Sequence, residues 1–242
     1  MMQAVRHYAY RKLLDHGWLV RRSRTGGWEA GRTYGEEAAY LKRLGFHPAT
    51  IVDVGVGTGT EALYAAFPHA YLVMIEPLAE FSHAIQAILA RRSGVHVPVA
   101  AGGAACRRTI WIEPRFMLRS SLYQRCAAER TPETKIPREV PVSTLDAIAK
   151  ELRFPAPYGL KLDAEGAELE IIGGATDLLR DTLFVIAETS VMNRFEGSYS
   201  FVDLVARMDQ LGFQICDILD IGRAESSEVT FFDLVFRRRE VP

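Results

Sequence analysis

The sequence predicts an α/β protein built on a mostly parallel, doubly wound sheet. Short β-branched runs without polar alternation recur along the chain, as in strands that are buried on both faces. Amphipathic segments separate these runs, so strand and helix alternate as they do in a sheet that helices cover on both faces. The 242 residues are enough for one large domain with a full core.

Apolar runs mark the strands in order along the chain. We expect buried strands at 49–55, 70–77, 95–103, 158–163 and 182–190, a further strand segment at 109–114, and closing strands at 214–222 and 229–239. Only residues 223–228 join the two closing strands. Because this link is too short for a helical crossover, the closing strands should pair antiparallel.

Helices are expected where apolar residues recur at helical spacing between these strands. The expected ranges are 36–44, 61–66, 81–92, 144–153, 167–180 and 201–212. Ser143 or Thr144 can cap the fourth of these helices at its N-terminus. Glycines follow the first helix, at Gly45, and end the last, at Gly212.

Two segments stand apart from this alternation. Residues 1–45 are predicted to form a helical extension or cap before the main domain of 46–242, with an amphipathic helix over 1–24 and a Gly-rich loop over 23–35. Arginines make the start of this extension basic, which fits either a solvated helix face or a surface for an anionic substrate or membrane. Residues 115–139 have no clean period and are predicted to be a lid insertion.

Composition limits the classes of function. Lys and Arg number 29 and Asp and Glu 30, and this balance argues against a general nucleic-acid binder. The three cysteines, Cys106, Cys126 and Cys216, are odd in number and match no metal-ligand spacing, so reduced thiols in a cytoplasmic protein are the simplest interpretation. We expect no transmembrane segment and no secretory signal. The oligomeric state stays open, with a homodimer among the alternatives.

A glycine-rich turn follows the first strand and carries the first chemical signal. In DVGVGTGTE, residues 53–61, glycines let the backbone approach a ligand, and the next helix presents free N–H groups to an anion. A dinucleotide fingerprint would read G-x-G-x-x-G, whereas here the spacing is G-x-G-x-G. Glu76 directly follows the second strand, where a carboxylate can accept both hydroxyls of a ribose. Loop and acid together resemble the cofactor loop of class I S-adenosylmethionine-dependent methyltransferases.

A crowded acidic segment carries the second signal. YGLKLDAEGAELEIIGGA, residues 158–175, holds four carboxylates just after a buried strand. Asp163 closes that strand and Glu188 closes the next, so both should face the crevice at the strand ends. Glu165 lies at the turn. Glu168 and Glu170 fall in the first turn of the next helix, where a negative charge stabilises the helix through its dipole by about 0.3–1 kcal/mol.

KLDAEGAELEIIGGA, with VSTLDAI before it, resembles the FkbM family of methyltransferases. The resemblance extends from about 50 to 237 and includes the SSL of 120–122 and the late strand FFDLVF. It implies a Rossmann-like class I methyltransferase fold, with a mostly parallel seven-stranded sheet, an antiparallel last strand and helices on both faces. It also implies S-adenosylmethionine as cofactor and O-methylation of a hydroxyl on a sugar, glycan or secondary metabolite. Family loops often read G-x-N-x-G, whereas Thr58 follows Gly57 here, which leaves the side-chain contacts at that point undecided.

These signals give two sets of candidate residues. The cofactor-binding candidates are Asp53, Gly55, Gly57, Thr60, Glu61, Glu76, Pro77, Ala101 and Asp163. The catalytic candidates are Asp163, Glu165 and Glu188, because an aliphatic hydroxyl reacts only as its proton leaves and a nearby carboxylate can accept that proton. In the lid, Arg115, Arg119, Arg125, Ser120 and Ser121 either read the acceptor or are merely solvated.

Three alternatives stay open at this point. Clustered carboxylates suit Mg²⁺, but no coordination set is fixed and methyl transfer has no absolute need of a metal, so a metal is not favoured. An NAD(P)-dependent oxidoreductase is disfavoured by the missing third glycine and by the lack of a Tyr-x-x-x-Lys pair. The third alternative is a non-catalytic protein that binds S-adenosylmethionine.

Overall fold

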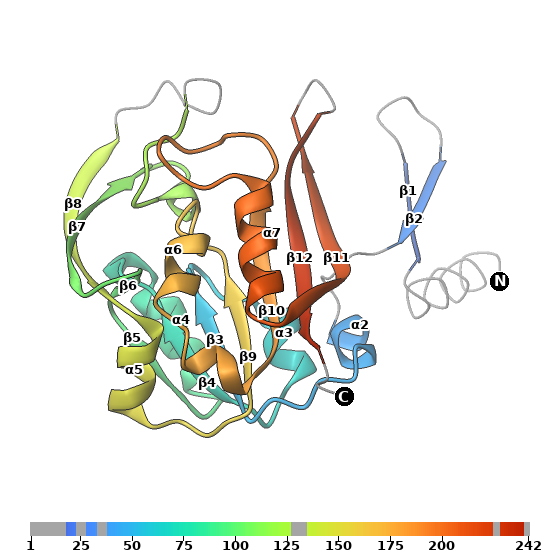
Figure 1. The fold of residues 1–242 in the computed structure, drawn as a ribbon, viewed down its shortest axis with the longest axis horizontal. Helices are drawn as coiled ribbons and strands as arrows, with labels where there is room; N and C mark the ends of the chain where they lie inside the picture. Colours follow the sequence, from blue (N-terminus) through green and yellow to red (C-terminus); the bar gives the residue numbers. More distant parts are fainter. Residues whose placement is uncertain (1–17, 23–27, 33–37, 127–134, 225–227, 240–242) are drawn as a thin grey trace.

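A seven-stranded sheet runs through the protein in the order β11-β12-β10-β9-β3-β4-β5 (Figure 1). The computed structural model describes residues 18–22, 28–32, 38–126, 135–224 and 228–239. The strands of the sheet are β3 (Thr50–Val54), β4 (Tyr71–Ile75), β5 (Gly94–Val97), β9 (Tyr158–Leu162), β10 (Thr182–Ser190), β11 (Phe213–Arg223) and β12 (Val229–Arg238). β12 pairs antiparallel with both β10 and β11, whereas the pairs among β5, β4, β3, β9 and β10 are parallel. The predicted fold class, including the antiparallel closing pair, is confirmed.

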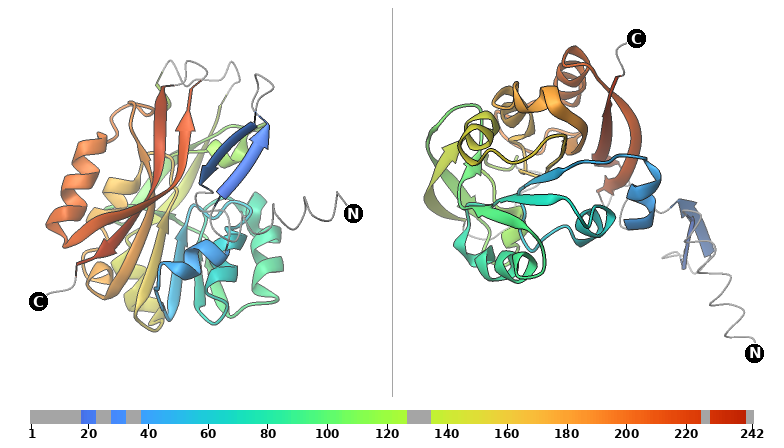
Figure 2. Two further views of the ribbon diagram at one scale, coloured as in Figure 1. Left: turned by 90° about the vertical axis from the view of Figure 1, so that its right-hand side faces the viewer. Right: turned by 90° about the horizontal axis from the view of Figure 1, so that it is seen from below.

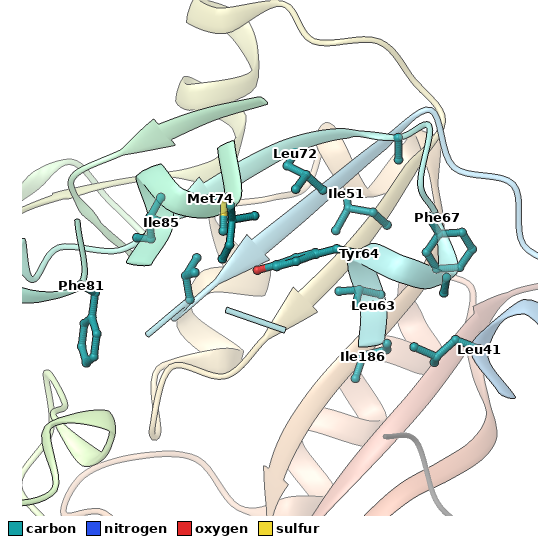
Figure 3. Packing of buried hydrophobic residues seen from close by; sticks show 14 of the residues in the cluster. Leu41, Ile51, Leu63, Tyr64, Phe67, Leu72, Met74, Phe81, Ile85 and Ile186 are labelled. Carbon is teal, nitrogen blue, oxygen red and sulfur yellow. The ribbon is translucent and has the colours of Figure 1, made fainter. Parts of the chain in front are cut away.

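Helices cover both faces of this sheet and enclose two apolar layers (Figures 1 and 2). The helices α2 (Ala38–Arg43), α3 (Glu61–Ala66) and α4 (Ser82–Leu89) share one layer, and α5 (Leu145–Leu152), α6 (Glu168–Gly173) and α7 (Phe201–Gln210) share the other. Within β3 the side chains alternate, so Ile51 packs in the first layer and Val52 in the second. Figure 3 shows Leu63 and Tyr64 of α3 lying against this first-layer face of the strands.

The order of the strands places a crevice at the centre of the sheet. From β3 the chain winds outward through β4 to β5, and it later returns to β9 on the other side of β3. The order of the strands therefore reverses between β3 and β9. Open α/β sheets bind ligands at such a switch point, outside the carboxyl ends of the strands. The glycine-rich turn after β3 and the acidic segment after β9 meet there.

A second, three-stranded sheet borders this crevice. It consists of β6 (Ala100–Ala101), β8 (Ile136–Ser143) and β7 (Cys106–Ile112), with β8 in the middle. The prediction of one strand over 95–103 was therefore wrong: β5 ends at Val97, and β6 belongs to the small sheet. Pro98 has no N–H to donate to a ladder, which explains the break. Strand β8 also begins at Ile136, within the range 115–139 that was predicted to be irregular.

The helix predicted over 167–180 is two shorter pieces. Helix α6 ends at Gly173, and a 3₁₀ turn, η4 (Leu178–Asp181), follows. Two consecutive glycines favour this end, and the carboxylate of Asp146 accepts hydrogen bonds from the N–H groups of Asp177 and Leu178 at 2.8–3.1 Å. The second piece thus has its own capping carboxylate from α5, far away in the sequence.

The N-terminal prediction needs a correction too. An antiparallel pair, β1 (Trp18–Arg22) and β2 (Trp28–Arg32), stands where the later part of the predicted helix and the middle of the predicted loop were expected. Tryptophan and valine favour strands, and a Gly-Gly pair in the sequence between two such runs favours a hairpin. The predicted helix over 1–17 lies outside the described residues, and the domain boundary near 45 stays a prediction.

Candidate functional site

A cavity of about 390 Å³ lies at the carboxyl ends of β3, β4, β9 and β10. Of the residues predicted from sequence, it brings together Gly55, Gly57, Thr60, Glu76, Pro77, Ala101, Asp163, Glu165 and Glu188. The residues that the sequence interpretation did not single out include Leu78, Phe81, Ile110 and Lys161. The cavity therefore has a glycine-loop side, an apolar wall and an acidic side.

The glycine loop rests directly on the turn that carries Asp163. Gly55 has φ +74°, and a β-carbon there would overlap the carbonyl oxygen of Asp163. Gly57 has φ +53°, and a β-carbon there would meet the side chain of Leu118. L-residues with side chains rarely adopt these backbone angles. Bare backbone at both positions thus leaves room for a ligand and fixes the loop against the acidic turn.

Glu76 is buried beside the glycine loop and faces the cavity. Its two carboxylate oxygens accept hydrogen bonds from the N–H groups of Gly57 at 3.0 Å and Leu78 at 2.9 Å. Burial raises the pKa of Glu76, although these two hydrogen bonds act to lower it. A carboxylate oxygen can accept more than one hydrogen bond. Glu76 is therefore oriented to accept two further hydroxyl donors, which fits the ribose of an adenosine-containing cofactor.

Two predicted cofactor residues lie outside the cavity lining. Asp53 is buried beneath it and accepts a hydrogen bond from the hydroxyl of Tyr64 on α3. The carboxylate of Glu61 pairs with Arg92 at 3.2 Å, and its side chain is 72% exposed. Asp53 thus supports the loop from below, whereas Glu61 points to the surface. Sequence spacing placed both near the loop but could not give the direction of either side chain.

Lys161 links Asp53, beneath the glycine loop, with Asp163 on the acidic side of the cavity. Its ammonium nitrogen lies 3.1 Å from Asp163 Oδ2 and 3.6 Å from Asp53 Oδ1. Burial acts to lower the pKa of Lys161, but the charges of Asp163 and Asp53 outweigh it and raise that pKa. Lys161 therefore stays protonated and holds Asp163, whose side chain is 41% exposed at the cavity. A charged residue within an otherwise apolar buried strand was the sequence signal for it.

Two buried arginines hold the other two predicted catalytic carboxylates. Glu165 has φ +49° and pairs with Arg125 at 2.8 Å and with Arg194 at 3.3 Å. Burial raises the pKa of Glu165, and the two guanidinium groups oppose that rise. Arg194 also pairs with Glu188. Burial, followed by the charges of Glu165 and Asp163, raises the pKa of Glu188 well above its usual value.

The described part of the predicted lid packs on the site. It includes a 3₁₀ turn, η2 (Met117–Arg119), and residues 117–122 line the cavity. The hydroxyl of Ser121 donates to the carbonyl of Glu165 at 2.5 Å, and Arg125 is fully buried. Residues 127–134 of the lid lie outside the described residues. The alternative of a merely solvated loop is therefore wrong for the part of the lid that contains Ser121 and Arg125.

Glu168 and Glu170 lie in the first turn of α6, and both carboxylates make structural contacts there. The buried carboxylate of Glu168 accepts hydrogen bonds from the N–H groups of Ala164 and Gly166 and from the hydroxyl of Tyr199, at 2.8–3.2 Å. Glu168 thus clamps the turn that carries Asp163 and Glu165.

Glu170 points the other way, towards the small sheet. Its carboxylate pairs with Arg108 at 2.7 Å and accepts hydrogen bonds from the Gly103 N–H at 3.1 Å and the Tyr123 hydroxyl at 2.8 Å. These bonds lower the pKa of Glu170 although burial opposes them. Glu170 therefore joins α6 to the small sheet and to the lid segment.

We expect Glu168→Gln to remove a pH dependence of stability. Burial raises the pKa of Glu168 to about 7, although its hydrogen bonds oppose the rise. A carboxyl group whose pKa is raised by folding contributes stability below its unfolded pKa and loses that contribution as the pH rises through about 7. Between pH 4.5 and 8 the wild type should lose up to ~3 kcal/mol relative to the variant. Urea unfolding of both proteins at several pH values measures this difference, and a difference that stays constant with pH would contradict the expectation.

The described residues contain no group of three or more His, Cys, Asp or Glu side chains arranged to hold a metal ion. Among the helices of the same residues, none is long and apolar enough to cross a membrane.

A protein family matches this chain in sequence, and known structures resemble it in fold. A family model described as the methyltransferase FkbM domain matches residues 53–215. The crystal structure of methyltransferase FkbM from Methylobacillus flagellatus KT aligns with a TM-score of 0.46 and 16% identity over 78% of this chain. The chain spans 43% of the length of that protein. No curated protein matches this chain in sequence.

Two further solved structures are similar at lower identity. Magnesium protoporphyrin IX methyltransferase from Synechocystis PCC 6803, with bound S-adenosylmethionine, has a TM-score of 0.44 and 10% identity, and the alignment covers 84% of this chain and 76% of that one. Fibrillarin from Aeropyrum pernix, also with S-adenosylmethionine, has a TM-score of 0.43 and 12% identity, and the alignment covers 91% of this chain and 94% of that one.

Proposed function

This chain belongs to the methyltransferase FkbM domain family, and we propose that it methylates a hydroxyl oxygen of a sugar, glycan or secondary metabolite. The family match confirms the resemblance drawn from the acidic segment. The oxidoreductase alternative is thereby set aside. That this chain is an S-adenosylmethionine-dependent methyltransferase is part of the proposal, together with oxygen as the receiving atom and the class of acceptor.

The convergence of three carboxylates beside the glycine loop carries the proposal. Asp163, Glu165 and Glu188 all line the cavity, next to Gly55 and Glu76. S-adenosylmethionine, when bound, supplies a methyl group on a positively charged sulfur. In that cavity Glu76 would hold the ribose, and the bare backbone of the glycine loop would let the cofactor approach closely.

The acidic side supplies what a hydroxyl acceptor needs. An aliphatic hydroxyl becomes a good nucleophile only as its proton is removed, and a positioned carboxylate can contribute ~100-fold or more by accepting it. Asp163 directly follows β9, Glu188 lies near the end of the neighbouring parallel strand β10, and both reach the cavity. Lys161 holds the first and Arg194 holds the second. Fixed carboxylates also orient the acceptor oxygen, and positioning alone can contribute several kcal/mol.

A methyl-transfer screen tests the proposal. The enzyme is incubated with S-adenosylmethionine that carries a trideuterated methyl group and with panels of glycans, nucleotide sugars and small-molecule alcohols. Mass spectrometry then identifies the labelled product and the atom that bears the label. Label on an oxygen supports the proposal. Label found only on nitrogen or carbon would contradict it, and binding of the cofactor without transfer to any acceptor would favour the non-catalytic alternative.

We expect Glu76→Gln to weaken binding of both S-adenosylmethionine and S-adenosylhomocysteine by about 10-fold or more. A neutral amide forms weaker hydrogen bonds to hydroxyls than a carboxylate does, and its NH₂ group cannot accept from the Gly57 or Leu78 N–H. Titration calorimetry gives both affinities. Glu80→Gln is the matched control, because Glu80 pairs with Arg138 at 2.6 Å and does not line the cavity. Unchanged affinity in Glu76→Gln would remove Glu76 from the cofactor site.

The remaining assignments extend the same proposal. The catalytic unit spans 46–242, residues 1–45 form an extension, and the protein works in the cytoplasm on a small-molecule or glycan acceptor. Cys106, Cys126 and Cys216 form no disulfide among the described residues, which is compatible with a reducing compartment.

A further inference from the structure

Arg194 is a buried arginine that the sequence interpretation did not single out. It follows the end of β10, and its side chain is 8% exposed. One guanidinium nitrogen donates to Glu188 Oε1, and the other donates to Glu165 Oε2 at 3.3 Å. A single planar side chain thus holds both of these cavity carboxylates.

Aromatic rings and backbone bonds fix the position of Arg194. Its guanidinium carbon lies 4.8 Å from the centre of the Phe231 ring on β12 and 5.2 Å from that of Phe195. Its carbonyl oxygen accepts the N–H of Cys126 at 2.8 Å, so the lid segment holds its backbone. Arg125, which also pairs with Glu165, lies over the same Phe195 ring, with its guanidinium carbon 4.8 Å from the ring centre. An arginine fork held in this way loses little freedom when it binds a carboxylate.

Glu188 lies among several other charged or titratable groups. The charges of Glu165 and Asp163, from the turn after β9, and of Arg194 act on it directly. Asp233 is its register partner on β12 and is itself influenced by Lys161 of β9, and the Tyr199 hydroxyl donates to the Glu188 carbonyl at 3.3 Å. Acids outnumber cations in this set. Glu188 Oε2 has no hydrogen-bond donor among the residues that the structure describes, whereas Oε1 is held by Arg194.

We propose that Arg194 is a positioning residue that fixes the Glu188 carboxylate through Oε1, so that Oε2 is left for the acceptor. This inference rests on the proposed function, in which Glu188 takes or orients the acceptor proton. Arg194 itself touches neither substrate nor cofactor in this account. It acts by opposing the rise in the pKa of Glu188 and by holding that carboxylate in one orientation beside the other acids.

The proposal has a direct electrostatic consequence. A cation at hydrogen-bond distance commonly shifts the titration of a carboxylate by ~1–3 pH units. Without Arg194, Glu188 would face Glu165 and Asp163 with no guanidinium beside it, and would take up a proton at higher pH. Arg194→Gln should therefore raise the titration midpoint of Glu188 by about one unit or more, and Arg194→Lys, which keeps the charge, should raise it less.

Carbon-detected NMR of protein labelled at the glutamate carboxyl carbons measures these midpoints, with Glu188→Gln used to assign the signal. Arg238→Gln is the matched control, because Arg238 lies 4.5 Å over the Phe213 ring and contacts the carbonyls of Leu179 and Thr182 but not the cavity. A raised midpoint in Arg194→Gln, with no change in Arg238→Gln, supports the proposal. An unchanged midpoint in Arg194→Gln, or equal shifts in the two Arg194 variants, would overturn it.

A measurement on the wild type covers the case in which Arg194→Gln does not fold. In protein labelled with ¹⁵N at arginine, the side-chain nitrogens of Arg194 should change their shifts with the same midpoint as Glu188. Arg194 signals that do not respond while Glu188 titrates would overturn the proposal. Neither experiment uses an acceptor or methyl transfer, so their outcome is independent of the acceptor screen.

Discussion

We expect Gly55→Ala to abolish binding of S-adenosylmethionine and to lower the free energy of unfolding by about 3 kcal/mol or more. Gly55 has φ +74°, which strains any residue with a β-carbon. The added methyl would also overlap the carbonyl oxygen of Asp163. Relief requires the glycine loop and the acidic turn to separate, and the cavity between β3 and β9 depends on their contact.

Gly45→Ala separates these two effects. Gly45 has nearly the same backbone angle, φ +76°, but a β-carbon there meets nothing within 4 Å. It should therefore cost only the backbone strain, roughly 1 kcal/mol, and leave cofactor binding intact. Urea unfolding and titration calorimetry of both variants make the comparison. Equal losses in the two variants, or full cofactor affinity in Gly55→Ala, would show that the contact with Asp163 does not shape the site.

The second large effect is expected for Asp163→Asn. The amide keeps the size of the carboxylate and can still accept a hydrogen bond from Lys161, which lies 3.1 Å from Asp163 Oδ2. It cannot accept a proton from the acceptor, and it removes a negative charge from the cavity. Turnover should fall by ~100-fold or more, while affinity for S-adenosylhomocysteine, which lacks the sulfur charge, should change by less than about threefold.

Steady-state rates with an acceptor found in the screen, together with calorimetry, test this split between turnover and affinity. Asp177→Asn is the control, since Asp177 is an exposed surface acid that pairs with Arg180 at 3.3 Å. Wild-type turnover in Asp163→Asn would assign the proton to Glu188 or to another group. A parallel loss of turnover and S-adenosylhomocysteine affinity would assign Asp163 to binding alone.

The sheet could be predicted because strands that are buried on both faces have nearly continuous apolar runs in the sequence. Residues 182–190 and 61–66 form a strand and a helix with the predicted bounds, since apolar pattern and turn residues agree there. The predictions were wrong where a local pattern competed with tertiary structure. Residues 95–103 are mostly apolar, yet the strand breaks at Pro98 and the two parts join different sheets. The helix after 167 ends at a glycine pair, and Asp146, from another helix, caps the next turn.

The site was predictable where the motif is local. The glycine loop, Glu76 and the strand-end acids meet in one cavity because parallel strands bring their carboxyl ends to one edge. Side-chain direction was not predictable, and Glu61 consequently pairs with Arg92 at the surface. Arg194 could not be found from sequence, because its contacts with Glu188 and Phe231 join segments that only the folded chain brings together.

Titration calorimetry of the wild-type protein tests the central claim, that the cavity between the glycine loop and the acidic turn holds S-adenosylmethionine. The account predicts one molecule of S-adenosylmethionine bound per chain, competition by S-adenosylhomocysteine, and no heat with NAD⁺ or NADP⁺. Binding of a nicotinamide dinucleotide in place of S-adenosylmethionine would contradict it.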